Sequence, residues 1–78
     1  MKDKLLAALR DWNDTIDFEK ESSLVTGGVI DSLEWAEMIE QIELAFSVEI
    51  PMERMLPESF DSLEAMIGLL DDLIGERS

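Results

Sequence analysis

The pattern of apolar residues predicts that the chain begins with an amphipathic helix. Apolar positions near the N-terminus recur mostly three or four residues apart, so they share one helical face, and charged residues occupy the opposite face. The predicted helix extends from about residue 2 to about residue 14. Its core-facing residues are Leu5, Leu6, Leu9 and Trp12, and Ile16 continues the same spacing one turn beyond.

Residues 15–30 show no helical period. The pairs Ser22–Ser23 and Gly27–Gly28 are typical of turns, and the apolar residues of this segment are irregularly spaced. Long ordered loops in compact domains usually serve a function. We therefore expect a long loop between the first and second helices, with its apolar residues packed over the core.

A second helix is predicted to begin at Asp31–Ser32. Asp and Ser are favoured N-cap residues, and Glu34 in the first turn completes a helix-start signature. The helix can run for about four turns, because Pro51 is the first helix-breaking residue after this start. The residues expected to face the core are Trp35, Met38, Ile39, Ile42, Ala45 and Phe46.

A short helical piece around residues 52–56 and a final helix complete the predicted fold. Asp61–Ser62 precedes the final helix as its cap, and Gly75 is the expected C-terminal stop. The prediction is one all-α domain over residues 1–78. It is a small four-helix bundle of three main helices and one short helix, and its last apolar stripe is Leu63, Ile67, Leu70 and Ile74.

The charge of the chain indicates which partners it can have. It contains 19 Asp and Glu against 6 Lys and Arg, a formal net charge of −13. Such a chain repels nucleic acids and anionic membranes, so we expect neither as a partner and instead expect proteins with basic surfaces. No apolar run is long enough for a signal peptide or a membrane span, which predicts a cytoplasmic protein, and we expect it to be a monomer.

The residue inventory excludes most catalytic chemistry. The chain has no Cys, His or Tyr, so it lacks a thiol nucleophile, an imidazole base and the usual zinc ligands. We therefore expect neither enzymatic activity nor a metal site. A calcium-binding loop is an alternative for the oxygen-bearing residues at 11–19, but Ile16 lies where such a loop needs Gly, and Ser22 where it needs a bidentate Glu.

The second predicted helix carries an unusual run of carboxylates. Glu34, Glu37, Glu40 and Glu43 follow one another at three-residue intervals, and no Lys or Arg occurs between Asp31 and Glu53. Like charges at this spacing cost a helix roughly 0.2–0.5 kcal/mol per pair. A solvated face is the simplest interpretation, but such a face would include Lys, and the pattern therefore favours binding to a basic partner.

The tetrapeptide Asp-Ser-Leu-Glu occurs at residues 31–34 and again at 61–64. On local sequence alone either serine could be a helix cap. Ser32 follows the flexible pair Gly27–Gly28 and opens the acidic helix, so we choose Ser32 as the functional hydroxyl and Ser62 as a structural cap. A helix N-terminus stabilises a phosphate group, and no His or Lys lies beside Ser32, so we interpret it as an acceptor that another enzyme modifies.

The segment Val29-Ile30-Asp31-Ser32-Leu33, followed by the acidic helix and Val48-Glu49-Ile50-Pro51, resembles acyl carrier proteins and related carrier domains. The resemblance extends from Leu24 to Leu73. It implies a four-helix bundle whose motif serine carries 4′-phosphopantetheine through a phosphodiester. The thiol of that group holds an acyl or aminoacyl cargo as a thioester for fatty acid, polyketide or nonribosomal peptide biosynthesis.

The resemblance also implies roles for individual residues. Ser32 is the attachment site, Asp31 is the neighbour that a phosphopantetheinyl transferase reads with its Mg²⁺ ion, and Leu33 adjoins the prosthetic group. The surface read by acyl- or aminoacyl-loading and transferring enzymes with basic patches comprises Glu34, Ala36, Glu37, Glu40 and Glu43.

Three positions depart from the family pattern. Ser47 stands where Gly is common, Trp35 is unusually bulky, and Glu40 is at a place that is often apolar in fatty-acid carriers. Residues 57–63 are more similar to carriers of amino acids or specialised metabolites, but the cargo stays open. The alternative function is an acidic helical protein–protein interaction module without a prosthetic group.

Overall fold

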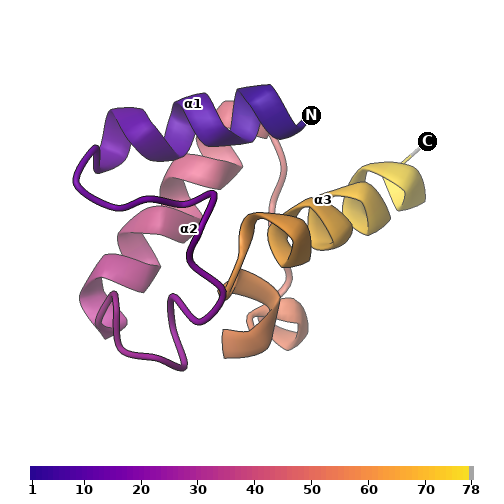
Figure 1. The fold of residues 1–78 in the computed structure, drawn as a ribbon. Helices are drawn as coiled ribbons and strands as arrows, with labels where there is room; N and C mark the ends of the chain where they lie inside the picture. Colours follow the sequence, from indigo (N-terminus) through magenta and orange to yellow (C-terminus); the bar gives the residue numbers. More distant parts are fainter. Residues whose placement is uncertain (78) are drawn as a thin grey trace.

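The computed structural model describes the backbone of residues 1–77 and the side chains of residues 1–75. Within this range the secondary structure is entirely helical, as predicted, and no strand is present (Figure 1). The elements are α1 (Lys2–Trp12), α2 (Ser32–Phe46), the 3-10 turns η1 (Met52–Arg54) and η2 (Pro57–Phe60), and α3 (Leu63–Arg77).

The helices pack around one apolar core. Helix α1 contacts both α2 and α3, and α3 also contacts η2. Every fully buried side chain that the structure describes is apolar, and the largest of these are Phe18 and Phe60. Hydrophobic burial therefore holds the fold together, and the described ionisable side chains are exposed or only partly buried. None of the helices in residues 1–77 has the length and apolar character needed to cross a bilayer.

Helix α1 buries the predicted leucines and ends earlier than expected. Leu5, Leu6 and Leu9 are buried, and the helix stops after Trp12 because Asn13 adopts an extended conformation. The Asn13 side-chain oxygen accepts hydrogen bonds from the backbone N–H and the hydroxyl of Thr15, at 3.0 and 2.6 Å. This local turn competes with the next helical turn, as Asn side chains often do.

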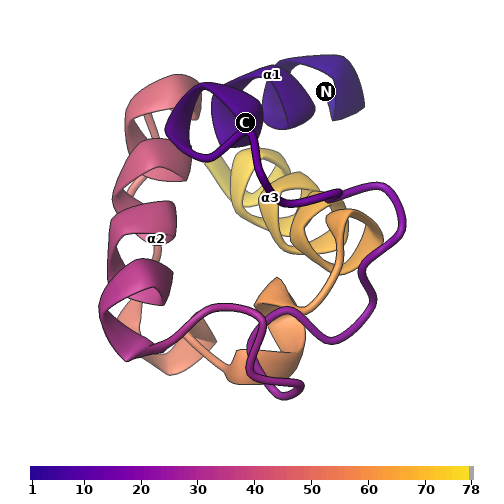
Figure 2. The same cartoon turned by 60° about the vertical axis from the view of Figure 1, so that its left-hand side comes forward.

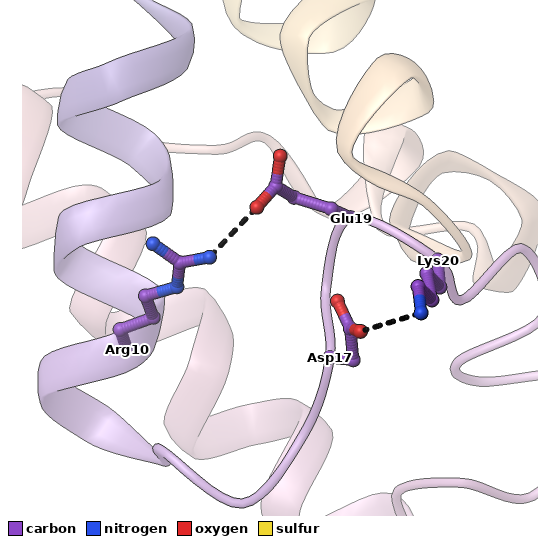
Figure 3. A network of polar contacts seen from close by, with 4 residues as sticks. All are labelled: Arg10, Asp17, Glu19 and Lys20. Carbon is purple, nitrogen blue, oxygen red and sulfur yellow. Dashed lines mark hydrogen bonds and ion pairs between the residues drawn. The ribbon is translucent and has the colours of Figure 1, made fainter.

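The connection between α1 and α2, residues 13–31, contains turns and bends. It crosses from α1 past α3 and η2 to the start of α2 (Figure 2). Most of its apolar residues pack into the core as predicted, since Phe18, Leu24 and Ile30 are buried, but Val29 is 40% exposed. On the surface Arg10 of α1 binds Glu19 at 2.7 Å, and Asp17 lies 4.0 Å from Lys20 (Figure 3). Exposed ion pairs of this kind contribute little, so buried side chains hold this segment.

Helix α2 begins where the sequence predicted. Met38, Ile39 and Ile42 are buried, whereas the other residues expected in the core are only half-buried. The helix ends at Ser47, which adopts the left-handed conformation with φ 52°. That conformation explains why Gly is the more favourable residue at such a helix end.

In the C-terminal third one expectation is wrong and another is met only in part. Gly75 does not stop α3, which continues to Arg77. Among the described glycines Gly28 has a positive φ and Gly75 does not, so Gly75 lacks the left-handed conformation of a helix stop. The predicted short helix around residues 52–56 is only the 3-10 turn η1, and η2 follows it. Pro57 holds Leu56 in an extended conformation, which leaves too little chain after Pro51 for an α-helix.

Candidate functional site

Ser32 is the first residue of α2, and the neighbouring aspartate provides the helix cap. A side-chain oxygen of Asp31 accepts the backbone N–H of Glu34 at 2.8 Å, and the Glu34 carboxylate accepts the backbone N–H of Asp31 at 3.1 Å. This reciprocal pair is a capping box. Because Asp31 supplies the cap, the fold does not require the Ser32 hydroxyl for that purpose. Ser32 and Asp31 are both exposed.

The backbone around Ser32 favours a negatively charged substituent. The first intrahelical hydrogen bond of α2 is donated by Trp35 to the carbonyl of Asp31 at 2.9 Å. The N–H groups of Ser32 and Leu33 precede it and point toward the N-terminal end, where the helix dipole is positive. An exposed hydroxyl at this place can therefore accept a phosphoryl group and have the product stabilised by the helix.

Leu33 and the helix face beyond it are open to solvent. The Leu33 side chain is 71% exposed, and Ala36, Glu37 and Glu40 are also exposed. Among the side chains described, the ion pairs join Arg10, Lys20 and Arg54 to acids outside α2. Within the side chains described, none of these ion pairs engages Glu37 or Glu40, so both carboxylates project negative potential from the exposed face of α2.

The other two predicted partner-binding glutamates also have structural tasks. Glu34 belongs to the capping box, and a carboxylate oxygen of Glu43 accepts the backbone N–H of Ile50 at 2.9 Å. The second contact fastens the segment after α2 to the end of the helix. The Asp-x-x-Glu spacing signals the task of Glu34 in the sequence, whereas nothing in the sequence signals that of Glu43.

A shallow hollow lies at the C-terminal end of this acidic face. It has a volume of about 590 Å³ and is open to solvent. Its lining residues are Glu40, Glu43, Leu44, Ser47, Val48 and Glu49. Leu44 is 69% exposed within this acidic surrounding, so α2 presents an apolar residue among its carboxylates at this end as well as at Leu33.

The second Asp-Ser-Leu-Glu copy has a different structure. The hydroxyl of Ser62 accepts the backbone N–H of Ala65 at 3.1 Å, so Ser62 caps α3 as predicted. The carboxylate of Asp61 instead accepts three hydrogen bonds from the connection between α1 and α2: the backbone N–H groups of Val25 and Thr26, both at 2.9 Å, and the Thr26 hydroxyl at 2.8 Å. Sequence reasoning missed this contact because the partners are about 36 residues apart.

Partial burial and hydrogen bonding act in opposite directions on Asp61. Burial raises the pKa of its carboxyl group, but the hydrogen bonds from Thr26 and Val25 stabilise the charged form more strongly. The net effect lowers the pKa below its ordinary value. The carboxylate is therefore ionised under all but acidic conditions.

Residues 11–19, for which a calcium-binding loop was the alternative, lie at the end of α1 and in the connection that follows it. In the described part of the chain, no group of three or more acidic side chains is arranged to hold a metal ion. Comparison of the chain with protein-family models, with curated proteins and with solved structures gave no match. The functional interpretation therefore rests on the residues and their geometry.

Proposed function

We propose that this protein is an acyl or aminoacyl carrier whose prosthetic arm is attached to Ser32. The observation that carries the proposal is the exposed Ser32 hydroxyl, which the helix cap leaves available at the positive end of an acidic helix. The motif around it, with the acidic helix and the following Val48-Glu49-Ile50-Pro51, resembles that of carrier domains. The proposal includes the four-helix bundle architecture of carrier domains, in which η1 and η2 of this chain take the place of the short helix.

The attachment step needs an external catalyst. The Ser32 oxygen forms a bond to the phosphorus of the pantetheine arm of coenzyme A, and the pyrophosphate bond breaks. The hydroxyl proton passes to a base of the transferase, and adenosine 3′,5′-bisphosphate leaves. No His or Cys exists in the chain to perform this step, and the modifying enzyme with its Mg²⁺ ion supplies the chemistry.

The residues around Ser32 fit a phosphodiester and a mobile arm. The N-terminal N–H groups of α2 stabilise the phosphate charge, and Asp31 is exposed beside it for the Mg²⁺ ion of the transferase. Leu33 offers an apolar contact at the base of the arm. When bound, 4′-phosphopantetheine supplies the thiol that holds the cargo as a thioester, a group that this cysteine-free chain lacks.

The exposed face of α2 is the proposed docking surface for the transferase and for loading and transferring enzymes. Ala36, Glu37 and Glu40 form its centre, and Leu33 and Leu44 add apolar contacts at either end. Glu34 and Glu43 contribute charge while they also bind backbone N–H groups. Basic patches on the partner complement this surface and accelerate encounter.

Intact-mass measurement tests the proposal. The purified chain is incubated with coenzyme A, Mg²⁺ and a broad-specificity phosphopantetheinyl transferase, and a known carrier protein serves as the positive control. We expect addition of one pantetheinyl phosphate to the wild-type chain and to Ser62→Ala, and none to Ser32→Ala. An unmodified wild-type chain, under conditions that fully convert the positive control, would favour the interaction module without a prosthetic group.

A further inference from the structure

The last part of the α1–α2 connection, residues 24–31, connects the core to Ser32 through a closely bonded turn. Leu24 is buried, and its carbonyl accepts the backbone N–H of Ile30 at 3.0 Å. The Gly27 N–H donates to the carbonyl of Ser23, the residue before Leu24, at 2.8 Å. A Cβ atom at Gly27 would clash with that carbonyl oxygen, so the turn requires glycine there.

This turn is joined to the start of α3 by Asp61. The carboxylate receives the Val25 and Thr26 contacts described above, and the Asp61 carbonyl accepts the backbone N–H of Leu24 at 3.0 Å. One residue thus binds the turn through both its side chain and its backbone. Ile30 lies at the other end of the turn, is buried, and directly precedes Asp31.

We propose that Asp61 is a positioning residue for the modification of Ser32, an inference that rests on the proposed carrier function. The carboxylate orders the turn at residues 24–30, and the turn determines the direction in which the chain enters Asp31 and the α2 cap. A modifying enzyme that reads Asp31 and Ser32 together then meets them already ordered. Without the Asp61 carboxylate, the enzyme must order the turn when it binds, which costs binding free energy.

Two substitutions of Asp61 separate the contact from the charge. Asp61→Ala removes every side-chain acceptor from the turn. Asp61→Asn removes the charge but keeps one oxygen, which can still accept the two backbone N–H groups. The matched control is Asp71→Ala, because Asp71 is exposed on α3 and its loss changes the net charge equally.

The kinetics of modification provide the first measurement. In Asp61→Ala we expect kcat/KM of the transferase for the carrier to fall about tenfold. The fall should come from a higher KM, with kcat nearly unchanged. Asp61→Asn should recover most of the loss, and Asp71→Ala should match the wild type. Thr26→Ala removes only the hydroxyl contact, and its kcat/KM should lie between those of the wild type and Asp61→Ala.

Amide hydrogen exchange provides a second measurement that does not depend on modification. We expect the N–H groups of Val25, Thr26 and Ile30 to exchange about tenfold faster in Asp61→Ala, with the amides of α1 unchanged. Unchanged exchange at the turn would disprove the ordering by Asp61. Faster exchange with wild-type kcat/KM would show that Asp61 orders the turn without assisting modification. A wild-type chain that the transferase does not modify would overturn the carrier function and the positioning role in modification, even if the exchange result held.

Discussion

The two copies of Asp-Ser-Leu-Glu show how one sequence can serve two different tasks. In the first copy Asp31 caps the helix and Ser32 is its first residue. In the second copy Ser62 makes the capping hydrogen bond and α3 begins one residue later in the motif, at Leu63. The shift changes which side chain is not used for capping. In the first copy it is the Ser32 hydroxyl, which is exposed, and in the second it is the Asp61 carboxylate, which binds the α1–α2 connection.

The preceding backbone explains this shift of one residue. Asp31 is extended, with φ −90° and ψ −176°, and a capping residue needs such a conformation. Asp61 follows the turn η2 directly and keeps right-handed helical angles, with φ −73° and ψ −25°. It therefore cannot occupy the capping position, and the next residue does. The structure before each motif, rather than the motif itself, decides which serine is available.

The sharpest test of this comparison replaces each serine in turn and measures both modification and stability. Ser32→Ala should abolish modification and change the free energy of unfolding by less than about 0.5 kcal/mol, because this hydroxyl is exposed and is not the cap. Ser62→Ala should leave modification intact and destabilise the fold by about 1 kcal/mol, because it removes a cap. Intact mass and urea denaturation measure the two effects. Equal stability losses would contradict the assignment of one cap and one free serine.

The two aspartates should also differ in their contribution to stability. Asp61→Ala removes three hydrogen bonds to the connection and should destabilise the fold by about 2 kcal/mol. Asp31→Ala removes one capping acceptor and should cost about 1 kcal/mol. Urea denaturation of both variants under the same conditions gives the difference. A larger loss in Asp31→Ala would mean that the link between Asp61 and the connection contributes little.

Charge reversal extends the comparison to the helices that follow the motifs. Glu37→Lys combined with Glu40→Lys on α2 should lower kcat/KM of the transferase about tenfold, since a basic partner is then repelled. Helicity, followed by circular dichroism, should be unchanged, and added salt should reduce the difference. Glu64→Lys combined with Asp71→Lys on α3 is the control with the same charge change, because both residues are exposed. Equal effects of the two double variants would show that net charge matters and the α2 face does not.

The smallest expected effect is the pH dependence contributed by Asp61. Its folded-state pKa lies below the ordinary value of 3.8, so its stabilising effect is complete above that value and is lost as the pH falls through the lower folded-state pKa. The stability difference between wild type and Asp61→Asn should therefore be constant near neutral pH and shrink below about pH 4. Urea denaturation at several pH values measures it. A difference that grows on acidification would contradict the lowered pKa.

Local sequence determined the parts of this protein that depend on neighbouring residues. The apolar spacing at Leu5 and Leu9 predicted the first helix, and the Asp31–Glu34 spacing predicted the start of the second, because both follow from the period and the end chemistry of a helix. The acidic face of α2 was also predicted from local sequence. The exposure of Glu37 and Glu40 follows from their place opposite the apolar residues.

Tertiary structure decided where each remaining polar group finds its partner. The hydrogen bonds of Asp61 with Val25 and Thr26, and of Glu43 with the backbone of Ile50, follow from no local sequence pattern. Gly75 stayed helical although its type favours a stop. The replacement of the expected short helix by 3-10 turns is, by contrast, a local effect of Pro51 and Pro57. Helical periodicity is a property of adjacent residues, whereas a buried or bridging contact exists only after the core has brought distant segments together.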